Sequence, residues 1–193
     1  MNGMKLAFAA LLLGTAVPGF AQSSVGREGA DFVQALRDGD DAKAADLVEA
    51  QPSVVNYRDG NGETPLLIAI GQRNSTWTGY LLNQHADPNV ADRKGDTPLI
   101  HAARLGFDNA VSWLLESGAR VDDRNRMGET PLIVAVQRRQ ESIVRLLLAN
   151  GADPDRTDTA AGYSARDYAK RDGRNPDILR MIEAAHKKAG PAR

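Results

Sequence analysis

The feature that most restricts the fold of this chain is a repeat with a period of about 33 residues. The tripeptide Thr-Pro-Leu begins at Thr64, Thr97 and Thr130, and a glycine lies shortly before each of these threonines. The same interval separates three alanines, Ala69, Ala102 and Ala135, and three leucine pairs that begin at Leu81, Leu114 and Leu147. A unit of this length cannot bury its apolar surface alone, so neighbouring units must stack into a solenoid.

Each unit has the residue pattern of a turn, a helix, a second turn and a second helix. In the second full unit, Thr97 is suited to cap a helix that starts at Pro98, where the missing N–H of proline costs no hydrogen bond. Gly106 is placed to end this helix in the left-handed conformation, and Gly118 to end the next one. Apolar residues recur at helical spacing between these signals, which predicts two short helices with one apolar face each.

The pattern Gly-x-Thr-Pro-Leu-x-x-Ala, followed by Leu-Leu-x-x-Gly-Ala-Asp, resembles the ankyrin repeat. The resemblance covers residues 31–186 and implies an all-α solenoid of helix-turn-helix units, with three full repeats and two capping repeats. The N-terminal cap runs from Asp31 to Arg58, and its second loop carries one extra residue near Pro52. The C-terminal cap begins near Gly162 and has charged residues where the full repeats are apolar, which suits an outer end.

The position after Thr-Pro-Leu departs from the family pattern. Ankyrin repeats often have a histidine there, which hydrogen-bonds the threonine hydroxyl between repeats, whereas this chain has Leu67, Ile100 and Ile133. We therefore expect apolar packing in place of that ladder of hydrogen bonds.

The glycine positions depart from the pattern as well. Arg73 and Arg139 stand where Gly106 ends the first helix of the second full unit. A left-handed conformation costs a non-glycine residue about 1 kcal/mol, so we expect these two turns to be looser or reshaped. His85 replaces the glycine that ends a second helix, and we expect it to occupy a C-cap position and to bind no metal.

The segment from Met1 to Ala21 has the pattern of a secretory signal peptide. Lys5 is followed by an apolar run from Leu6 to Val17, and small residues precede an expected cleavage site after Ala21. The run is shorter than the roughly 20 residues of a membrane span, and the absence of cysteine leaves no acceptor for a lipid anchor. We expect export to the bacterial periplasm or beyond, a short linker over residues 22–30 and a C-terminal tail over residues 187–193.

Composition excludes several classes of protein. The net charge is −1 and aromatic residues make up 5% of the chain, which argues against a nucleic-acid-binding protein. The absence of cysteine excludes disulfides, thiolate metal sites and cysteine nucleophiles. The three histidines are far apart in sequence, and no phosphate-binding loop or catalytic group of residues is present. We therefore expect no catalytic site, no cofactor and no metal.

One segment imitates a calcium-binding loop. Asp59 begins an acidic, glycine-rich stretch, but the twelfth position of such a loop requires a bidentate acid and is occupied here by Ile70. The turn between repeats is therefore the better interpretation of this segment.

In ankyrin-like arrays the turns and first helices line a concave groove, where partners usually bind. The resemblance carries this role to exposed turn and helix positions of this chain. The charged residues at these positions are seven basic and three acidic (Glu63, Asp96 and Glu129), a net charge of +4 on a chain whose expected mature form carries −2. The predicted binding residues are Arg58, Arg93, Lys94, Arg104, Leu105, Arg124, Arg126, Met127 and Arg138.

These observations predict a non-catalytic protein–protein interaction module of the periplasm whose partner presents an acidic contact patch. Within this class the resemblance leaves two roles open, an accessory factor for a periplasmic enzyme such as catalase and an immunity protein that neutralises a toxin. A secreted effector that binds a host protein, a structural spacer and an enzyme are the remaining alternatives.

Overall fold

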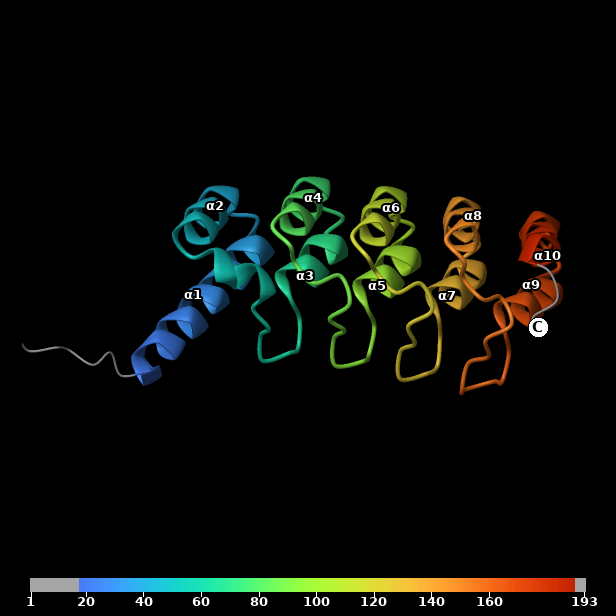
Figure 1. The fold of residues 1–193 in the computed structure, drawn as a ribbon, viewed down its shortest axis with the longest axis horizontal. Coiled ribbons are helices and arrows are strands. Elements are labelled where there is room, and N and C mark those ends of the chain that lie inside the picture. Colours follow the sequence, from blue (N-terminus) through green and yellow to red (C-terminus); the bar gives the residue numbers. More distant parts are fainter. Residues whose placement is uncertain (1–17, 190–193) are drawn as a thin grey trace, which may run out of the picture.

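The computed structural model describes residues 18–189, which form five helical pairs arranged side by side in one row (Figure 1). The first unit consists of α1 (Pro18–Asp38), α2 (Asp41–Ala50) and a 3₁₀ helix, η1 (Pro52–Asn56). The others are α3 (Pro65–Gly71) with α4 (Ser75–Asn83), α5 (Pro98–Leu105) with α6 (Asp108–Glu116), α7 (Pro131–Gln137) with α8 (Glu141–Ala149), and α9 (Ala165–Asp172) with α10 (Pro176–Ala189). The predicted all-α solenoid with three full and two capping units is confirmed.

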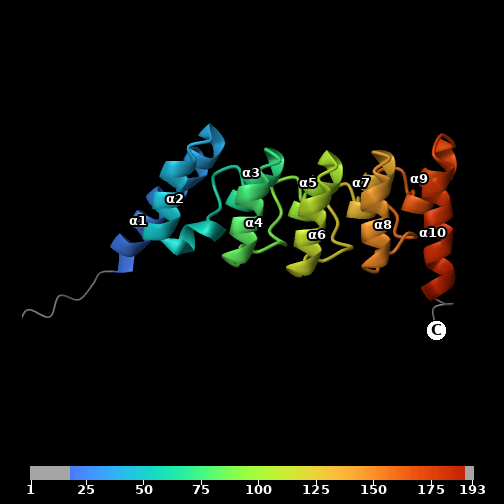
Figure 2. The ribbon, with the colours of Figure 1, turned by 90° about the horizontal axis from the view of Figure 1, so that it is seen from above.

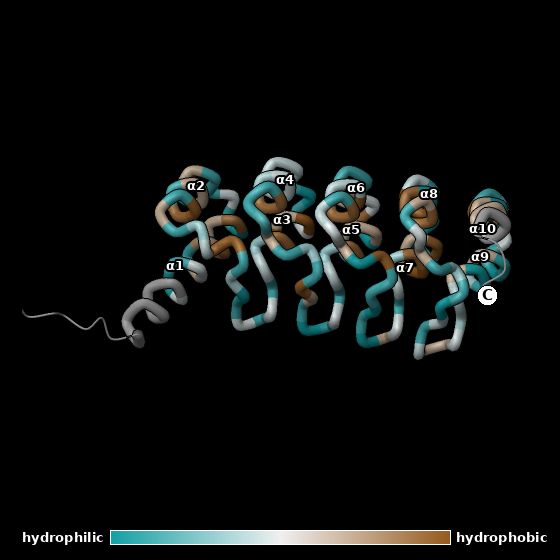
Figure 3. The backbone as a smooth tube through the Cα atoms, in the orientation of Figure 1, coloured by the Kyte–Doolittle hydropathy of each residue, from teal (hydrophilic) through white to brown (hydrophobic). Residues whose placement is uncertain are grey.

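The helices lie in two layers. The odd-numbered helices form an inner layer and the even-numbered helices an outer layer, and within the inner layer each helix packs on the next (Figures 1 and 2). Apolar segments lie where the two layers meet (Figure 3). Four extended turns project from the inner layer on the side away from the outer helices (Figure 1). We call these turns fingers 1 to 4; they comprise residues 57–63, 90–96, 123–129 and 156–163.

Threonine caps start the inner helices of the full repeats, as the sequence predicts. The Thr97 hydroxyl accepts a hydrogen bond from the amide of Ile100 at 3.3 Å, and Thr64 and Thr130 make the same contact in their own repeats. The residues that replace the family histidine, including Ile100, are buried apolar side chains, so the expectation of apolar packing is confirmed.

The turns at Arg73 and Arg139 are not reshaped, which contradicts the prediction. Their φ angles are 55° and 57°, close to the 66° of Gly106. Contacts to the next repeat offset the strain of about 1 kcal/mol. Arg73 donates hydrogen bonds to the carbonyls of Leu105 and Gly106, and Arg139 donates two to Asp172, at 2.7 and 2.8 Å. The C-cap of α4 is Gln84, and His85 follows it with a φ of 60°, so His85 takes the left-handed conformation that glycine has at the end of the second helices of the other full repeats.

The ends of the chain are more helical than expected. Residues 22–30, predicted to be a linker, belong to α1, and Gly29 lies against the ring of Tyr57, where a larger side chain would not fit. At the other end α10 continues to Ala189, into the predicted tail. Most of the expected signal peptide, residues 1–17, lies outside the described residues, so cleavage after Ala21 stays a prediction. Among the described helices, none has the length and apolar character needed to cross a membrane.

An equivalent side chain holds each finger in shape. Asp59, Asp92, Asn125 and Asp158 occupy the same position in successive fingers, and Oδ1 of each accepts two backbone N–H bonds from the turn that follows. In finger 1 both distances are 2.8 Å. The other oxygen of Asp59, Oδ2, accepts a hydrogen bond from Arg37 at 2.6 Å. The segment that begins at Asp59 is the turn between the first and second units, as the sequence predicts.

Neighbouring fingers are also bonded to each other. Arg58 of finger 1 donates to the carbonyl of Ala91 at 2.7 Å, and Arg93 of finger 2 donates back to the carbonyl of Gly60. Backbone hydrogen bonds connect the later fingers. The N–H of Arg126 donates to the carbonyl of Lys94, and the N–H of Thr159 donates to the carbonyl of Met127. The fingers therefore form one continuous, ordered surface.

Low pH is expected to destabilise the fingers. Burial alone would raise the pKa of Asp59, but hydrogen bonds from Arg37 and from the amides of Glu63 and Asn61 outweigh it and hold the pKa below its ordinary value. The pKa values of Asp92 and Asp158 are lowered in the same way, against the effect of burial, by hydrogen bonds to side chains and amides. A carboxylate with a lowered pKa stabilises the fold above about pH 4 and loses this contribution as the pH falls below that value.

We therefore expect the melting temperature to fall as the pH is lowered from 4 towards 2, as measured by circular dichroism. Asp172 adds to this effect, because its hydrogen bond to Arg139 lowers its pKa to about 2. Asp122 opposes it, since burial raises its pKa. Asp158→Asn keeps the acceptor oxygen but cannot titrate, so this variant should show a shallower fall. A melting temperature that stays constant or rises below pH 4 would contradict the expectation.

Candidate protein-binding surface

A hollow of about 410 Å³ lies between fingers 2 and 3 and the end of α5. It is lined by Arg93, Lys94, Asp96, Arg104, Asn125, Arg126 and Met127. Five of the nine predicted binding residues therefore lie together, drawn from two neighbouring repeats. We call this space the finger hollow.

The other four predicted residues lie outside the finger hollow. Arg58 is on finger 1, Arg124 is at the start of finger 3, and Leu105 and Arg138 end or follow inner helices. All four are exposed. The predicted surface thus extends along several repeats, with its concave part between fingers 2 and 3.

Five of the seven basic residues of this surface fall into two groups. Arg58 and Arg93 connect fingers, and Arg104 forms an ion pair with Asp96 at 2.8 Å. Lys94 and Arg126 are exposed, and their side chains make no hydrogen bond or ion pair with other described residues. The sequence could not separate these groups, because the contact partners of Arg58 and Arg93 lie in neighbouring repeats.

Met127 supplies apolar surface beside these two cations. Its side chain is 50% exposed, whereas large apolar side chains of the described residues are otherwise mostly buried. Two hydrogen bonds hold the backbone of Met127. Its N–H donates to Asn125 Oδ1, and its carbonyl accepts from the N–H of Thr159. An exposed thioether on a fixed backbone is well suited to contact an apolar group of a partner.

A buried polar cluster supports the finger hollow from below. Nδ2 of Asn125 donates to Asp96 Oδ1 and to Glu129 Oε2, both at 2.8 Å. All three residues are buried. The repeat pattern predicts Asp96 and Glu129 in the binding groove but does not predict Asn125 there. The signal was available, since Asn125 is the one amide in a series of repeat positions otherwise occupied by aspartates.

Asp92, Asp96 and His101 come close enough for one atom of each to lie within 4.8 Å of the others. Nε2 of His101 lies 3.1 Å from Asp92 Oδ2, while Asp92 Oδ1 holds the finger turn. Oδ1 of Asp96 already accepts from Arg104 and Asn125. These contacts make the three residues part of the hydrogen-bond network that joins finger 2 to α5 and to Asn125.

Together, the row of helical pairs and the bonded fingers define a helical repeat solenoid with an ordered row of turns along one side. The family model for ankyrin repeats, which spans three copies, matches residues 27–125 and again residues 74–158. The chain belongs to the ankyrin-repeat family. A comparison with curated proteins found no match. Ankyrin repeats are protein–protein interaction modules and typically act as non-catalytic scaffolds, so protein binding is the general activity of this chain.

Proposed function

We propose that this protein is exported to the periplasm and docks a partner protein at the finger hollow, through an acidic patch on that partner. One observation carries the proposal. Lys94 and Arg126, whose side chains have no hydrogen-bond or ion-pair partner among the described residues, line the same hollow as the half-exposed Met127. A carboxylate of the partner would meet the cations while an adjacent apolar side chain covers Met127. Charged contacts speed the association of two proteins, and a buried apolar anchor slows their dissociation.

The rigidity of the surface supports this mode of binding. Hydrogen bonds within and between fingers hold the backbone on both sides of the hollow. A surface that is ordered before binding loses little conformational entropy when the partner docks. The proposed mechanism is therefore docking of a preformed surface, without a chemical step.

Charge reversal tests the proposal. Lys94→Glu/Arg126→Glu changes the sign of the two cations, and neither side chain gives up a hydrogen bond or ion pair to another described residue. We expect the doubly substituted protein to lose at least about tenfold in affinity for its partner, because like charges then face each other across the interface. The measurement is affinity capture from periplasmic extract with mass spectrometry, followed by titration of the captured protein.

The matched control is Lys43→Glu/Arg145→Glu, which makes the same charge change on the outer helices. This control should capture the partner as well as the unmodified protein does. Equal loss in both variants would indicate a general charge effect and would overturn the proposed site. Absence of the protein from the periplasmic fraction would overturn the proposed location.

The identity of the captured protein separates the roles that remain open. We propose the accessory role, in which the partner is an endogenous periplasmic enzyme such as a catalase, and deletion of this chain lowers that enzyme's activity. Capture of a toxin, with sensitivity of the deletion strain to neighbouring cells, would replace this role by immunity. Recovery of the protein mainly from culture medium would favour a secreted effector.

A further inference from the structure

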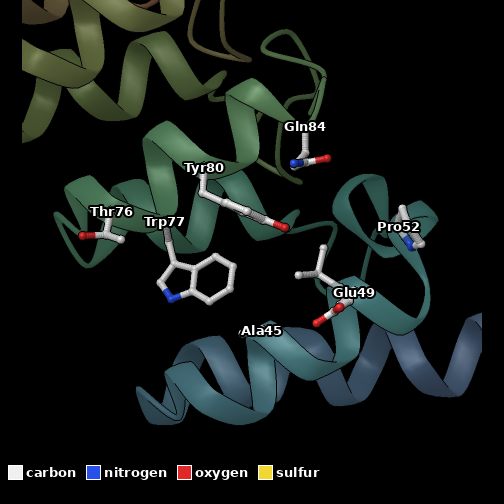
Figure 4. Close-up of a pocket in the computed structure, with 8 residues that line it drawn as sticks. Ala45, Glu49, Pro52, Thr76, Trp77, Tyr80 and Gln84 are labelled. Atoms are coloured by element: carbon white, nitrogen blue, oxygen red, sulfur yellow. The ribbon is translucent and has the colours of Figure 1, made fainter.

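A second hollow lies on the outer layer, between α2 and α4, away from the fingers (Figure 4). Its volume is about 500 Å³. It is lined by Ala45, Val48, Glu49, Pro52, Thr76, Trp77, Tyr80 and Gln84. We call this space the α2–α4 slot.

The slot exists because α2 packs less closely on its outer neighbour than the later outer helices do. Asp41, Ala45 and Glu49 are spaced four residues apart, so they form one stripe of α2, and this stripe faces α4. The small side chain of Ala45 leaves space at the middle of the stripe. Between α4 and α6 the corresponding gap is narrowed by Trp113, whose indole lies over Gly79.

The aromatic wall of the slot is rigid. Nε1 of Trp77 donates to Asp41 Oδ1 at 2.7 Å, which orients the indole. Trp77 also makes edge-to-face contacts with Phe32 and Tyr80, with ring centroids 5.8 and 5.3 Å apart. Trp77 is nearly buried, whereas Tyr80 is 37% exposed and presents its ring to the slot (Figure 4). A ligand would therefore meet a preformed wall.

The rim of the slot is acidic. Glu49 projects from α2 on the side of the space opposite the two rings (Figure 4). Among the described residues its carboxylate has no hydrogen-bond or ion-pair partner. Asp41 places a second carboxylate at the other end of the stripe. The larger hollow between α8 and α10 has neither an acidic side chain nor an aromatic ring in its lining, and it carries the basic Arg145.

We propose that the α2–α4 slot binds an arginine side chain presented by a partner protein. The aliphatic stem of the arginine covers Ala45 and Val48, its guanidinium stacks on the ring of Tyr80, and its N–H groups donate to Glu49. A planar guanidinium stacks on aromatic rings and pairs with a carboxylate in the same pose, which an ammonium group does less well. This site is independent of the finger hollow and has the opposite charge preference.

The test uses the tripeptide acetyl-Leu-Arg-Leu-amide and the same peptide with citrulline, which has the shape of arginine without its charge. The indole N–H resonance of Trp77 reports binding by ¹⁵N NMR, and Trp113→Phe distinguishes it from the other indole. We expect a saturable shift with the arginine peptide and an affinity for the citrulline peptide that is at least about fivefold lower.

Glu49→Gln should lower the affinity for the arginine peptide about fivefold and leave that for the citrulline peptide unchanged. Glu116→Gln is the matched control, since it removes the same charge from the end of α6, and it should change neither affinity. Both residues are exposed, so both variants should fold. Equal binding of the two peptides, an unmoved Trp77 resonance, or an arginine affinity unaffected by Glu49→Gln would overturn the proposal.

Discussion

Replacement of Asn125 by aspartate is expected to destabilise the protein by about 3 kcal/mol at pH 7. The Asn125 amide donates to Asp96 and to Glu129, and all three residues are nearly buried. An aspartate would keep the oxygen that holds finger 3 but lose both donated hydrogen bonds. It would also place a third negative charge beside two buried carboxylates, of which Asp96 alone has an ion-pair partner, Arg104, among the described residues. Repulsion and lost hydrogen bonds therefore act together.

Urea unfolding measured against the unmodified protein at several pH values checks this result. Repulsion raises the pKa of the added carboxyl group in the folded state above its unfolded value of about 3.9. The difference in stability is then fully present above the folded pKa and shrinks as the pH falls through it. Asp92→Asn is the reverse exchange at the matching position of finger 2 and should cost about 1 kcal/mol or less. A penalty independent of pH would show that charge is not its cause.

Substitution of Gly128 by alanine should have a similarly large effect, a loss of about 3 kcal/mol. Gly128 has a φ of 75°, which alone costs an alanine about 1 kcal/mol. In addition, a Cβ atom there would lie 2.6 Å from the backbone nitrogen of Thr159 in finger 4. Because a backbone atom cannot rotate away, finger 4 must move, and the Thr159–Met127 hydrogen bond must lengthen.

Gly151→Ala separates the two contributions. Gly151 has a φ of 84°, but no atom lies within 4 Å of the position its Cβ would take. This variant should lose about 1 kcal/mol, the conformational strain alone. Urea unfolding gives both free energies, and amide hydrogen exchange at Thr159 should rise only in Gly128→Ala. If both variants lose the same amount, the close approach of the added Cβ to Thr159 costs nothing, which would contradict the prediction.

Local signals in the sequence were sufficient for the secondary structure of the full repeats. The caps at Thr64, Thr97 and Thr130 were predicted because a helix N-terminus depends on a few adjacent residues. The prediction of reshaped turns at Arg73 failed for the converse reason. Local strain argues against a left-handed arginine, and the contacts that offset it come from Leu105 and Gly106 of the next repeat.

For the candidate binding residues too, the sequence predicts position but not contacts with neighbouring repeats. Their positions on the fingers follow from the period of the repeat, so the sequence placed the basic residues on one face. It could not tell that Arg58, Arg93 and Arg104 have partners in the protein whereas Lys94 and Arg126 have none among the described residues. The partners of Arg58 and Arg93 depend on the spacing and angle between repeats, which no single repeat specifies.

The repeat, its two helices, its turns and the family could therefore be predicted, because periodicity and capping are encoded within each unit. Which charges remain available, and where the surface is hollowed, depends on how the repeats pack together. The α2–α4 slot is the clearest example. Most of its residues are ordinary positions of two outer helices, and the slot arises because those two helices make few contacts with each other.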